Sequence, residues 1–335
     1  MSARIRVLWL KDGKVGHLNK ARGLLRALGR DKEIDLIEWQ LQWRFPWARA
    51  LLSWLGRRGL WLPTQLVLRG LPCLDRLDLV VSAGGATQWP NAAIAAQQRV
   101  PNVFLGSLRR MAPGNFSLIA SHDPPSTEPP FHRFELIPSM VTPEAAREAA
   151  QASGAAWGLL IGGNGEGLSW QAGDYVALLE RFIQQARRAG ARVWVATGRR
   201  TPEAVEARLR AMARESGLLA GGCWFRGGRG GPGLLAMMGA CEWLGVTADS
   251  MSMIHESVSS GRKVVVVRPD GQHGNSRLQG NLAGLESAGH IVVQPLGELE
   301  MAGAQPDAGW SLIHGDPTAS LAERVHHLLD VHTSS

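Results

Sequence analysis

The sequence predicts an α/β protein made of two facing, Rossmann-like domains, each with a doubly wound parallel sheet. Short runs rich in Val, Leu and Ile recur along the chain, and each ends in a glycine or polar cluster. A stretch with helical character follows most of these runs, which is the pattern of βαβ units. The chain has 335 residues, whereas one domain usually holds ~100–200, so two domains are expected.

The first predicted domain covers residues 1–140 and is followed by a connection. Its expected strands are residues 5–10, 77–82, 102–105 and 116–120, and its expected helices are residues 18–28 and 91–98. Residues 141–156 are polar and rich in alanine. We therefore interpret them as an interdomain connection that contains one helix.

The second predicted domain covers residues 157–316, and a C-terminal helix and tail cover residues 317–335. Its expected strands are 157–161, 192–196, 222–225, 242–246 and 263–267, and its expected helices are 174–189, 202–216, 234–240 and 252–259. In doubly wound sheets all strands end at one edge, and ligands bind there. The clusters that follow the strands therefore predict a ligand between the two facing edges.

Composition excludes several classes of protein. Hydrophobic residues make up 45% and charged residues 19%, which excludes global disorder. We find neither an apolar run of the ~18–20 residues that span a bilayer nor a signal peptide. Three widely spaced cysteines argue against a disulfide framework or a cysteine zinc site and favour a cytoplasmic location. The net charge of +7 permits nucleic acid, anionic lipid or phosphorylated ligands without choosing among them.

The loop after the expected strand 157–161 is rich in glycine. It reads Gly162-Gly163-Asn164-Gly165. Glycines let backbone N–H groups approach an anion, and the helix that follows adds a partial positive charge. The spacing is neither G-x-G-x-x-G nor a Walker loop, and a tight turn without a ligand explains the stretch equally well.

The stretch that follows residues 242–246 gives a sharper signal. It contains Thr247, Asp249, Ser250 and Ser252 at the expected start of a helix, where unpaired backbone amides can hold a diphosphate. Glu256 follows Ser250 by six residues, and its carboxylate can accept hydrogen bonds from ribose hydroxyls. A helix cap with a surface glutamate is the alternative for this stretch alone.

These residues carry a resemblance. The series Ser250, Glu256 and Gly261, followed by the strand at 263–267, resembles the nucleotide-sugar site of GT-B glycosyltransferases, especially the lipid-linked N-acetylglucosaminyl transferase of peptidoglycan synthesis. The resemblance implies that the turn at Ser250, Met251 and Ser252 holds the diphosphate and that Glu256 holds the ribose.

The chain resembles the ELM1-like family more closely. The matching stretches cover most of the chain: Asp12-Gly13-Lys14, Val81-Ser82-Ala83-Gly84-Gly85, Ser121-His122-Asp123, Ile161-Gly162-Gly163 and Val246-Thr247-Ala248-Asp249-Ser250-Met251-Ser252-Met253. This family is GT-B-like and widespread in bacteria, and many members are described as glycosyltransferases of unproven activity. The segment 226–233 holds more glycine than the family pattern, so the resemblance does not extend to recognition of the base.

The resemblance implies transfer of a sugar from a nucleoside diphosphate to an acceptor hydroxyl. Positive groups can stabilise the departing diphosphate, and we identify no Asp-x-Asp metal signature, so metal-independent transfer without a cofactor is expected. His17, in a loop similar to the histidine-containing loop of the transferases, is the first candidate for the general base. Asp123, next to His122, is the second. Helix capping by His17 and turn formation by Asp123 are the structural alternatives.

Further residues are candidates for substrate binding. Lys14 in the first loop and Arg199, Arg200, Arg226 and Arg268 after strands of the second domain can each reach phosphate, although any of them can equally be a solvated surface side chain. The glycines and the acid of the first-domain loops complete the set: Asp12, Gly13, Gly16, Gly84 and Gly85.

Residues 39–69 contain five of the thirteen tryptophans and no acidic residue. The segment holds Trp39, Trp43, Trp47, Trp54 and Trp61 with Arg44, Arg49, Arg57, Arg58 and Arg69. Trp and Arg together fit an anionic membrane surface, here the inner face of a bacterial membrane, and this reading would suit a lipid-linked acceptor. The alternative is a helix pair packed on the first domain. Stacking on nucleic acid fits the rest of the chain less well, and no specific nucleic acid is expected.

Three functions remain open from the sequence. The first is a glycosyltransferase that uses a nucleotide sugar. The second is a non-catalytic scaffold or adaptor of the ELM1 type. The third is a nucleotide-sugar epimerase, which can share the fold, but the first half of the chain lacks a clear set of carboxylates for epimerisation.

Overall fold

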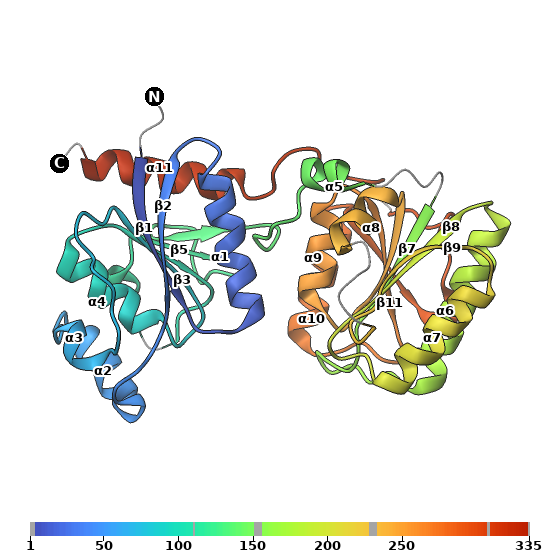
Figure 1. Cartoon of the computed structure of the whole chain (residues 1–335), viewed down its shortest axis with the longest axis horizontal. Coiled ribbons are helices and arrows are strands. Elements are labelled where there is room, and N and C mark those ends of the chain that lie inside the picture. Colours follow the sequence, from blue (N-terminus) through green and yellow to red (C-terminus); the bar gives the residue numbers. More distant parts are fainter. Residues whose placement is uncertain (1–3, 110, 151–155, 228–232, 307–308, 334–335) are drawn as a thin grey trace. The chain divides into compact units, whose positions relative to one another are not determined.

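The computed structural model describes residues 4–109, 111–150, 156–227, 233–306 and 309–333. Two compact units divide the chain: unit 1 is Met1–Met140 with Pro317–Ser335, and unit 2 is Val141–Asp316. Each holds a six-stranded sheet whose neighbouring strands are parallel, with helices packed against it (Figure 1). The prediction of two doubly wound parallel sheets is confirmed. Among the helices of the described ranges, none has both the length and the apolar character needed to cross a membrane.

The sheet of unit 1 has the order β2-β1-β3-β4-β5-β6. From β1 the chain goes first to β2 on one side and then to β3 on the other, so the order reverses between β1 and β3. Such a reversal is where doubly wound sheets bind ligands. The elements are β1 (Arg4–Lys11), α1 (Val15–Leu28), β2 (Glu33–Gln40), η1 (Pro46–Ala48), α2 (Arg49–Gly56), α3 (Thr64–Val67), β3 (Leu79–Ala83), α4 (Gln88–Gln98), β4 (Asn102–Leu105), η2 (Pro113–Asn115), β5 (Leu118–Ser121), β6 (Phe131–Arg133) and α11 (Ala319–Thr333).

Helices bury both faces of the unit 1 sheet. In β1, Val7 and Trp9 belong to one hydrophobic core together with side chains of α1 and α11. Leu8 and Leu10 belong to a second core together with side chains of α2 and α4. Because successive side chains of a strand point to opposite faces, a strand covered on both sides reads as the continuous apolar run that the sequence shows.

The sheet of unit 2 has the order β12-β11-β10-β7-β8-β9. The chain proceeds from β7 to β8 and β9, then returns to place β10 on the other side of β7, so the order reverses between β7 and β10. The elements are α5 (Pro143–Ala149), β7 (Ala156–Ile161), α6 (Ala172–Arg188), β8 (Arg192–Thr197), α7 (Glu203–Glu215), β9 (Leu219–Cys223), α8 (Leu234–Ala240), β10 (Trp243–Thr247), α9 (Met251–Ser259), β11 (Lys263–Arg268), α10 (Ser276–Ser287), β12 (Ile291–Pro295) and η3 (Leu296–Glu298).

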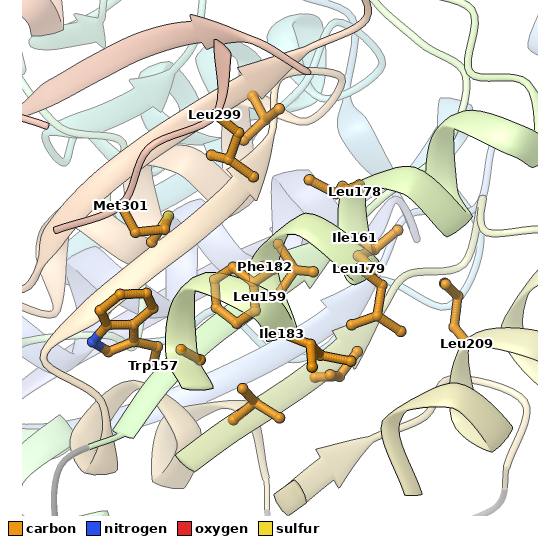
Figure 2. Close-up of a cluster of buried hydrophobic side chains, with 14 of the residues drawn as sticks. Trp157, Leu159, Ile161, Leu178, Leu179, Phe182, Ile183, Leu209, Leu299 and Met301 are labelled. Carbon is orange, nitrogen blue, oxygen red and sulfur yellow. The ribbon is translucent and has the colours of Figure 1, made fainter. Parts of the chain in front are cut away.

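The main core of unit 2 lies between the sheet and α6. Figure 2 shows Phe182 of α6 beside Leu159 and near Trp157, both of β7. The rings of Trp157 and Phe182 pack edge to face, with their centroids 6.1 Å apart. The first turn of α6 is held by a capping box in which Gln171 and Asp174 exchange hydrogen bonds. Packing and capping together fix the position of β7 against α6, and therefore the position of the loop that follows β7.

Two helices near the predicted domain boundaries pack on opposite units. α5 contacts α8, and a β-carbon on Gly239 of α8 would lie 1.9 Å from the carbonyl oxygen of Ala146. α11 contacts α1. The segment interpreted as a connection therefore contributes α5 to unit 2, although residues 151–155 lie outside the described residues, and the terminal helix contributes to unit 1.

Several elements escaped the sequence pattern. β2 carries Glu33, Asp35 and Glu38 and is partly exposed at the sheet edge, so it has no continuous apolar run. β6, α10 and β12 were also not identified, and the strand expected at 222–225 is Leu219–Cys223 instead. Gly221 and Gly222 lie in this strand against the rings of Trp194 and Trp224, and glycines weaken the strand signal.

Candidate functional site

Loops after three adjacent strands of unit 2 meet around Asp249. The strand order β10-β7-β8 places residues 249, 162 and 200 at neighbouring strand ends, at the reversal of the sheet. The amide of Gly162 donates to Oγ1 of Thr247 at 2.8 Å, and the amide of Gly163 donates to Oδ2 of Asp249 at 2.9 Å. Nη2 of Arg200 donates to the carbonyl oxygen of Asp249 at 2.8 Å and to Oδ2 at 2.7 Å. We call these five residues the Asp249 cluster.

The two glycines of the Asp249 cluster are required by close packing. A β-carbon on Gly162 would lie 2.2 Å from Oδ2 of Asp249, and one on Gly163 would lie 2.3 Å from the carbonyl oxygen of Arg200. Both amides donate within the cluster, and the amide of Gly165 donates to the carbonyl of Leu168 at 3.1 Å. The expectation that these glycine amides face an anion is therefore corrected: they hold the loop instead.

Arg200 connects the buried carboxylate to the surface. The Asp249 side chain is fully buried, whereas the Arg200 side chain is 42% exposed. Its Nη2 makes both bonds to Asp249, and the other three N–H groups of the guanidinium belong to Nη1 and Nε. The ion pair thus orients a guanidinium at the edge of the sheet, which is the group suited to bind phosphate oxygens.

The N-terminus of α9 begins next to Asp249. Ser250 is the N-cap residue with extended backbone, and its side chain makes no capping hydrogen bond. The amide of Ile254 donates to the carbonyl of Ser250 at 3.1 Å, so the amides of Met251, Ser252 and Met253 precede that bond. Amides at this position and the helix dipole favour an anion.

The other unit 2 candidates lie on several elements and have different roles. Glu256 is partly buried in α9, and Arg199 is exposed beside Arg200. Oδ1 of Asn164 accepts from the amide of Trp170 at 2.7 Å, so this side chain shapes the loop. The amide of Arg226 donates to the buried Glu206 at 2.9 Å, and its guanidinium lies 3.9 Å from Glu203, which places it beside α7. Residues 228–232 of the predicted glycine-rich segment lie outside the described residues.

A second cluster occupies the reversal of the unit 1 sheet. Asp12 follows β1, and its Oδ2 lies 2.7 Å from Nδ1 of His17 in the first turn of α1. The Asp12 side chain is almost fully buried, whereas that of His17 is partly exposed. Gly84 after β3 has φ of +93°, and a β-carbon there would lie 2.2 Å from Nδ1 of His17. We call Asp12, His17 and Gly84 the Asp12 cluster.

The Asp12 cluster defines the chemistry of His17. When Nδ1 donates its proton to Asp12, Nε2 is the ring nitrogen with a free lone pair, and it can take a proton from a substrate. The amide of Lys14 donates to the other carboxylate oxygen of Asp12 at 3.1 Å. A base that is oriented by a neighbouring carboxylate is one arrangement that general-base catalysis uses.

The other candidates of the first loops surround the Asp12 cluster. Gly13 has φ of +81°, which favours glycine, and its place allows the turn from β1 into α1. Lys14 is the exposed N-cap of α1, and a β-carbon on Gly16 would meet nothing within 4 Å. A β-carbon on Gly85 would lie 3.8 Å from Cδ of Arg109.

Asp123 lines a cavity in unit 1, after β5. The cavity has a volume of about 360 Å³, and its walls come from the loops after β4 and β5 with Met111, Ile119 and Phe131. Most of these walls are apolar, with Ser107, Ser121 and Asp123 as polar members. His122 is partly buried, and burial together with the positive charge of Arg133 lowers its pKa.

The sequence identified Arg200 only as one of several arginines. It did not reveal the buried polar side chains that hold the strand ends near the two clusters. Thr201 is fully buried, and its hydroxyl donates to the carbonyl of Ile161 at 3.0 Å. In unit 1, Asn102 donates to Asn91 at 2.7 Å, and Asn91 donates to Ser82 at 2.9 Å. Within the described residues, no group of three or more His, Cys, Asp or Glu side chains is placed to hold a metal ion.

Comparison with solved structures shows likeness of fold over nearly the whole chain. Acinetobacter baumannii MurG is 14% identical with a TM-score of 0.47 and covers 99% of this chain and 100% of its own. Escherichia coli ADP-heptose lipopolysaccharide heptosyltransferase II is 14% identical with a TM-score of 0.46, covering 98% and 100%. The UDP-GlcNAc 2-epimerase from Methanocaldococcus jannaschii is 10% identical with a TM-score of 0.52, covering 97% and 99%.

The two parallel sheets and the likeness to the epimerase confirm the predicted GT-B-like fold class. No curated protein matches this sequence. The family model described as "Mitochondrial fission ELM1" matches residues 15–329. This match spans nearly the whole chain, so the protein belongs to the mitochondrial fission ELM1 family.

Proposed function

We propose that this protein is a glycosyltransferase that binds a nucleoside-diphosphate sugar on unit 2 and an acceptor hydroxyl on unit 1. One observation carries the proposal: the N-terminus of α9, without a side-chain cap, begins beside a guanidinium that Asp249 holds in place at the reversal of the sheet. Amides and a guanidinium together suit a diphosphate.

In this proposal the diphosphate lies on α9. The amides of Met251 and Ser252, the hydroxyl of Ser250 and the guanidinium of Arg200 bind its oxygens, because each is a hydrogen-bond donor at the same edge. Glu256, further along α9, accepts from the ribose hydroxyls. Three further cations can bind phosphate groups of the substrates: Arg199 and Arg226 in unit 2 and Lys14 in unit 1.

On unit 1, the acceptor hydroxyl gives its proton to Nε2 of His17. Asp12 holds the ring and stabilises the imidazolium that forms. The acceptor oxygen then forms a bond to the anomeric carbon of the sugar while the bond from that carbon to the diphosphate breaks. The diphosphate leaves with the electron pair, and the amides of α9 and Arg200 stabilise its charge. Asp123, in its cavity, is the alternative base.

The cavity beside Asp123 suits the acceptor rather than the donor. Its mostly apolar walls can hold a non-polar part of the acceptor, while Ser107, Ser121 and Asp123 can bind hydroxyl groups. We infer a cytoplasmic reaction, because nucleotide sugars are charged donors that do not cross membranes unaided and the three cysteines form no disulfide.

The test is ligand-dependent thermal stability with UDP, ADP, GDP, dTDP and their common sugar conjugates. A ligand at about 100 times its Kd should raise the free energy of unfolding by about 2.7 kcal/mol. Arg200→Ala should abolish most of this stabilisation, because it removes a phosphate ligand. Glu256→Gln should weaken it less. Arg181→Ala, which removes an exposed arginine of α6, is the matched control for lost charge.

The outcomes separate the three candidate functions. If none of these nucleotides or nucleotide sugars stabilises the protein, the non-catalytic scaffold replaces the transferase. If a nucleotide sugar binds and is converted to its C2 epimer without transfer, the protein is an epimerase. If Arg181→Ala loses the stabilisation and Arg200→Ala keeps it, the proposed diphosphate site is wrong.

A further inference from the structure

Unit 1 gathers exposed apolar side chains in one segment. Of the twelve large apolar side chains that are exposed in the described part of the chain, seven come from residues 45–66, and their exposed fractions run from 44% to 80%. Large apolar side chains clustered in this way mark an interaction surface. We call them the Trp47 face: Phe45, Trp47, Leu51, Trp54, Leu60, Leu62 and Leu66.

The Trp47 face is the outer side of a packed element. In α2, Leu52 is buried in the hydrophobic core, and a β-carbon on Gly56 would lie 2.9 Å from the ring of Trp61. Leu51 and Trp54 of the same helix are exposed. Figure 1 shows α2 and α3 near α4, with which both are in contact. The inner side of the segment therefore packs on the hydrophobic core, whereas the apolar side chains of its outer side are exposed.

Hydrogen bonds fix the backbone beneath the face. The amide of Arg44 donates to the carbonyl of Val67 at 2.9 Å, and the amide of Arg69 donates to the carbonyl of Gln42 at 2.9 Å. The side-chain amide of Gln97 in α4 donates to the carbonyl of Leu62 at 2.8 Å. The two ends of the segment are thus joined to each other and its middle is joined to α4, so the apolar side chains are held outward before any partner binds.

The charge around the face has one sign. Arg44, Arg49, Arg57, Arg58 and Arg69 are all exposed, and the sequence has no Asp or Glu from Trp39 to Leu74. The guanidinium of Arg58 stacks on the exposed ring of Trp54 at 3.7 Å. Trp39 is buried and Trp43 and Trp61 are partly buried, so the structure assigns part of the tryptophan set to packing and leaves Trp47 and Trp54 at the surface.

We propose that the Trp47 face docks on the surface of an anionic lipid bilayer. Indole and leucine side chains insert at headgroup depth, and arginines around them bind lipid phosphates, which is the combination of apolar area and positive charge that peripheral membrane binding needs. The charge complementarity selects this occupant over a second copy of the chain, whose identical face would bring five arginines against five. This proposal does not depend on the proposed transferase activity.

The test is co-sedimentation of the full chain with vesicles. We expect binding to vesicles of phosphatidylglycerol and phosphatidylcholine in equal parts, little binding to phosphatidylcholine alone, and loss of binding at about 0.5 M salt. Trp47→Gln with Leu66→Gln tests insertion, and Arg57→Glu with Arg58→Glu tests charge. Each pair should lower the partition coefficient by about tenfold or more. All four side chains are exposed, so the fold should persist, which circular dichroism checks.

Matched controls make the result decisive. Met140→Gln removes an exposed apolar side chain elsewhere, and Arg181→Glu with Arg188→Glu makes the same charge change on α6; both should keep vesicle binding within about twofold. The proposal is overturned if the wild-type chain does not bind the anionic vesicles or if the face variants bind like the controls. It is also overturned if Trp47→Gln with Leu66→Gln only converts a dimer to a monomer, or if the face binds single-stranded RNA and not vesicles.

Discussion

The Asp12 cluster of unit 1 and the Asp249 cluster of unit 2 share one design. In each, an aspartate directly or nearly follows a strand at the reversal of the sheet order, and its side chain is buried. A glycine at the end of the adjacent strand lies against the carboxylate, with no room for a β-carbon. Both aspartates hold a partly exposed basic side chain.

The difference between the clusters lies in the basic partner. Asp12 holds a histidine, whose imidazole can accept and donate a proton, whereas Asp249 holds an arginine, whose guanidinium only donates hydrogen bonds. In the proposed function, the histidine of unit 1 transfers a proton and the arginine of unit 2 binds an anion. This division is what a transferase needs, because one substrate loses a proton and the other loses a diphosphate.

The largest expected effect is the loss of turnover in His17→Asn. If His17 is the base, release of nucleoside diphosphate from the best-binding sugar donor should fall by about 10²–10⁴-fold. Stabilisation by that nucleotide should not change, because the proposed nucleotide site lies on unit 2. Arg200→Ala should show the reverse pattern, with the loss in binding. The measurement is release of nucleoside diphosphate together with the nucleotide-dependent rise in Tm.

Asp12→Asn sharpens this test. The amide keeps the size of the side chain but removes the charge that stabilises the imidazolium, so turnover should fall less than in His17→Asn. If turnover survives in His17→Asn and is lost in Asp123→Asn, the base is Asp123, in the cavity after β5. The functional contrast between the two clusters is then wrong.

The sequence predicted the positions of both clusters but not all of their contacts. Apolar runs followed by glycine or polar clusters identified β1, β3, β7 and β10, and parallel topology implies that their ends share an edge. Which side chain Asp249 holds could not be predicted, because Arg199 and Arg200 are adjacent and both follow β8. The choice depends on the direction of the chain as it leaves β8, which tertiary packing decides.

The elements that escaped prediction are those without a fully buried environment. β2 is half-exposed and charged, and β9 contains two glycines. The sequence left the role of the glycines open between an anion site and a tight turn. Sequence shows that Gly162 and Gly163 are small, but not whether the space beside them holds a ligand or Asp249 and Arg200 of the same chain. Close backbone approach serves both purposes, and only the contacts distinguish them.

A smaller effect is expected from filling the two glycine positions. Gly162→Ala places a β-carbon 2.2 Å from Asp249, and Gly84→Ala places one 2.2 Å from His17 and also meets a φ of +93°. Each should lower the free energy of unfolding by about 1–3 kcal/mol, and Gly84→Ala should cost more because of its backbone. Urea denaturation measures both.

The control for these variants is Gly16→Ala, at a helical position where a β-carbon meets nothing within 4 Å. It should raise stability by about 0.5–1 kcal/mol, because alanine favours the helix. Unchanged stability in both Gly84→Ala and Gly162→Ala would show that the loops can move apart, and the shared design would lose its packing argument.

The smallest expected effect is a difference in response to pH. In unit 1, burial and Arg133 lower the pKa of His122, and burial and Arg324 lower the pKa of His132. Their neutral forms contribute stability that is present above the unfolded value of 6.5 and is lost as pH falls through the folded values. In unit 2, burial and Asp249 raise the pKa of Tyr175 to about 12, so its contribution is present below 10 and is lost as pH rises toward 12.

Calorimetry across pH distinguishes these contributions. His122→Gln with His132→Gln should flatten the loss of stability between about pH 7 and 5 and leave the alkaline side unchanged, because the substituted side chains no longer bind a proton. Tyr175→Phe should flatten the alkaline side alone. Since Tyr175 responds to the Asp249 charge, Asp249→Asn should reduce the alkaline shift as well. If the double histidine variant still loses stability as the pH falls from about 7 to 5, groups other than His122 and His132 titrate there.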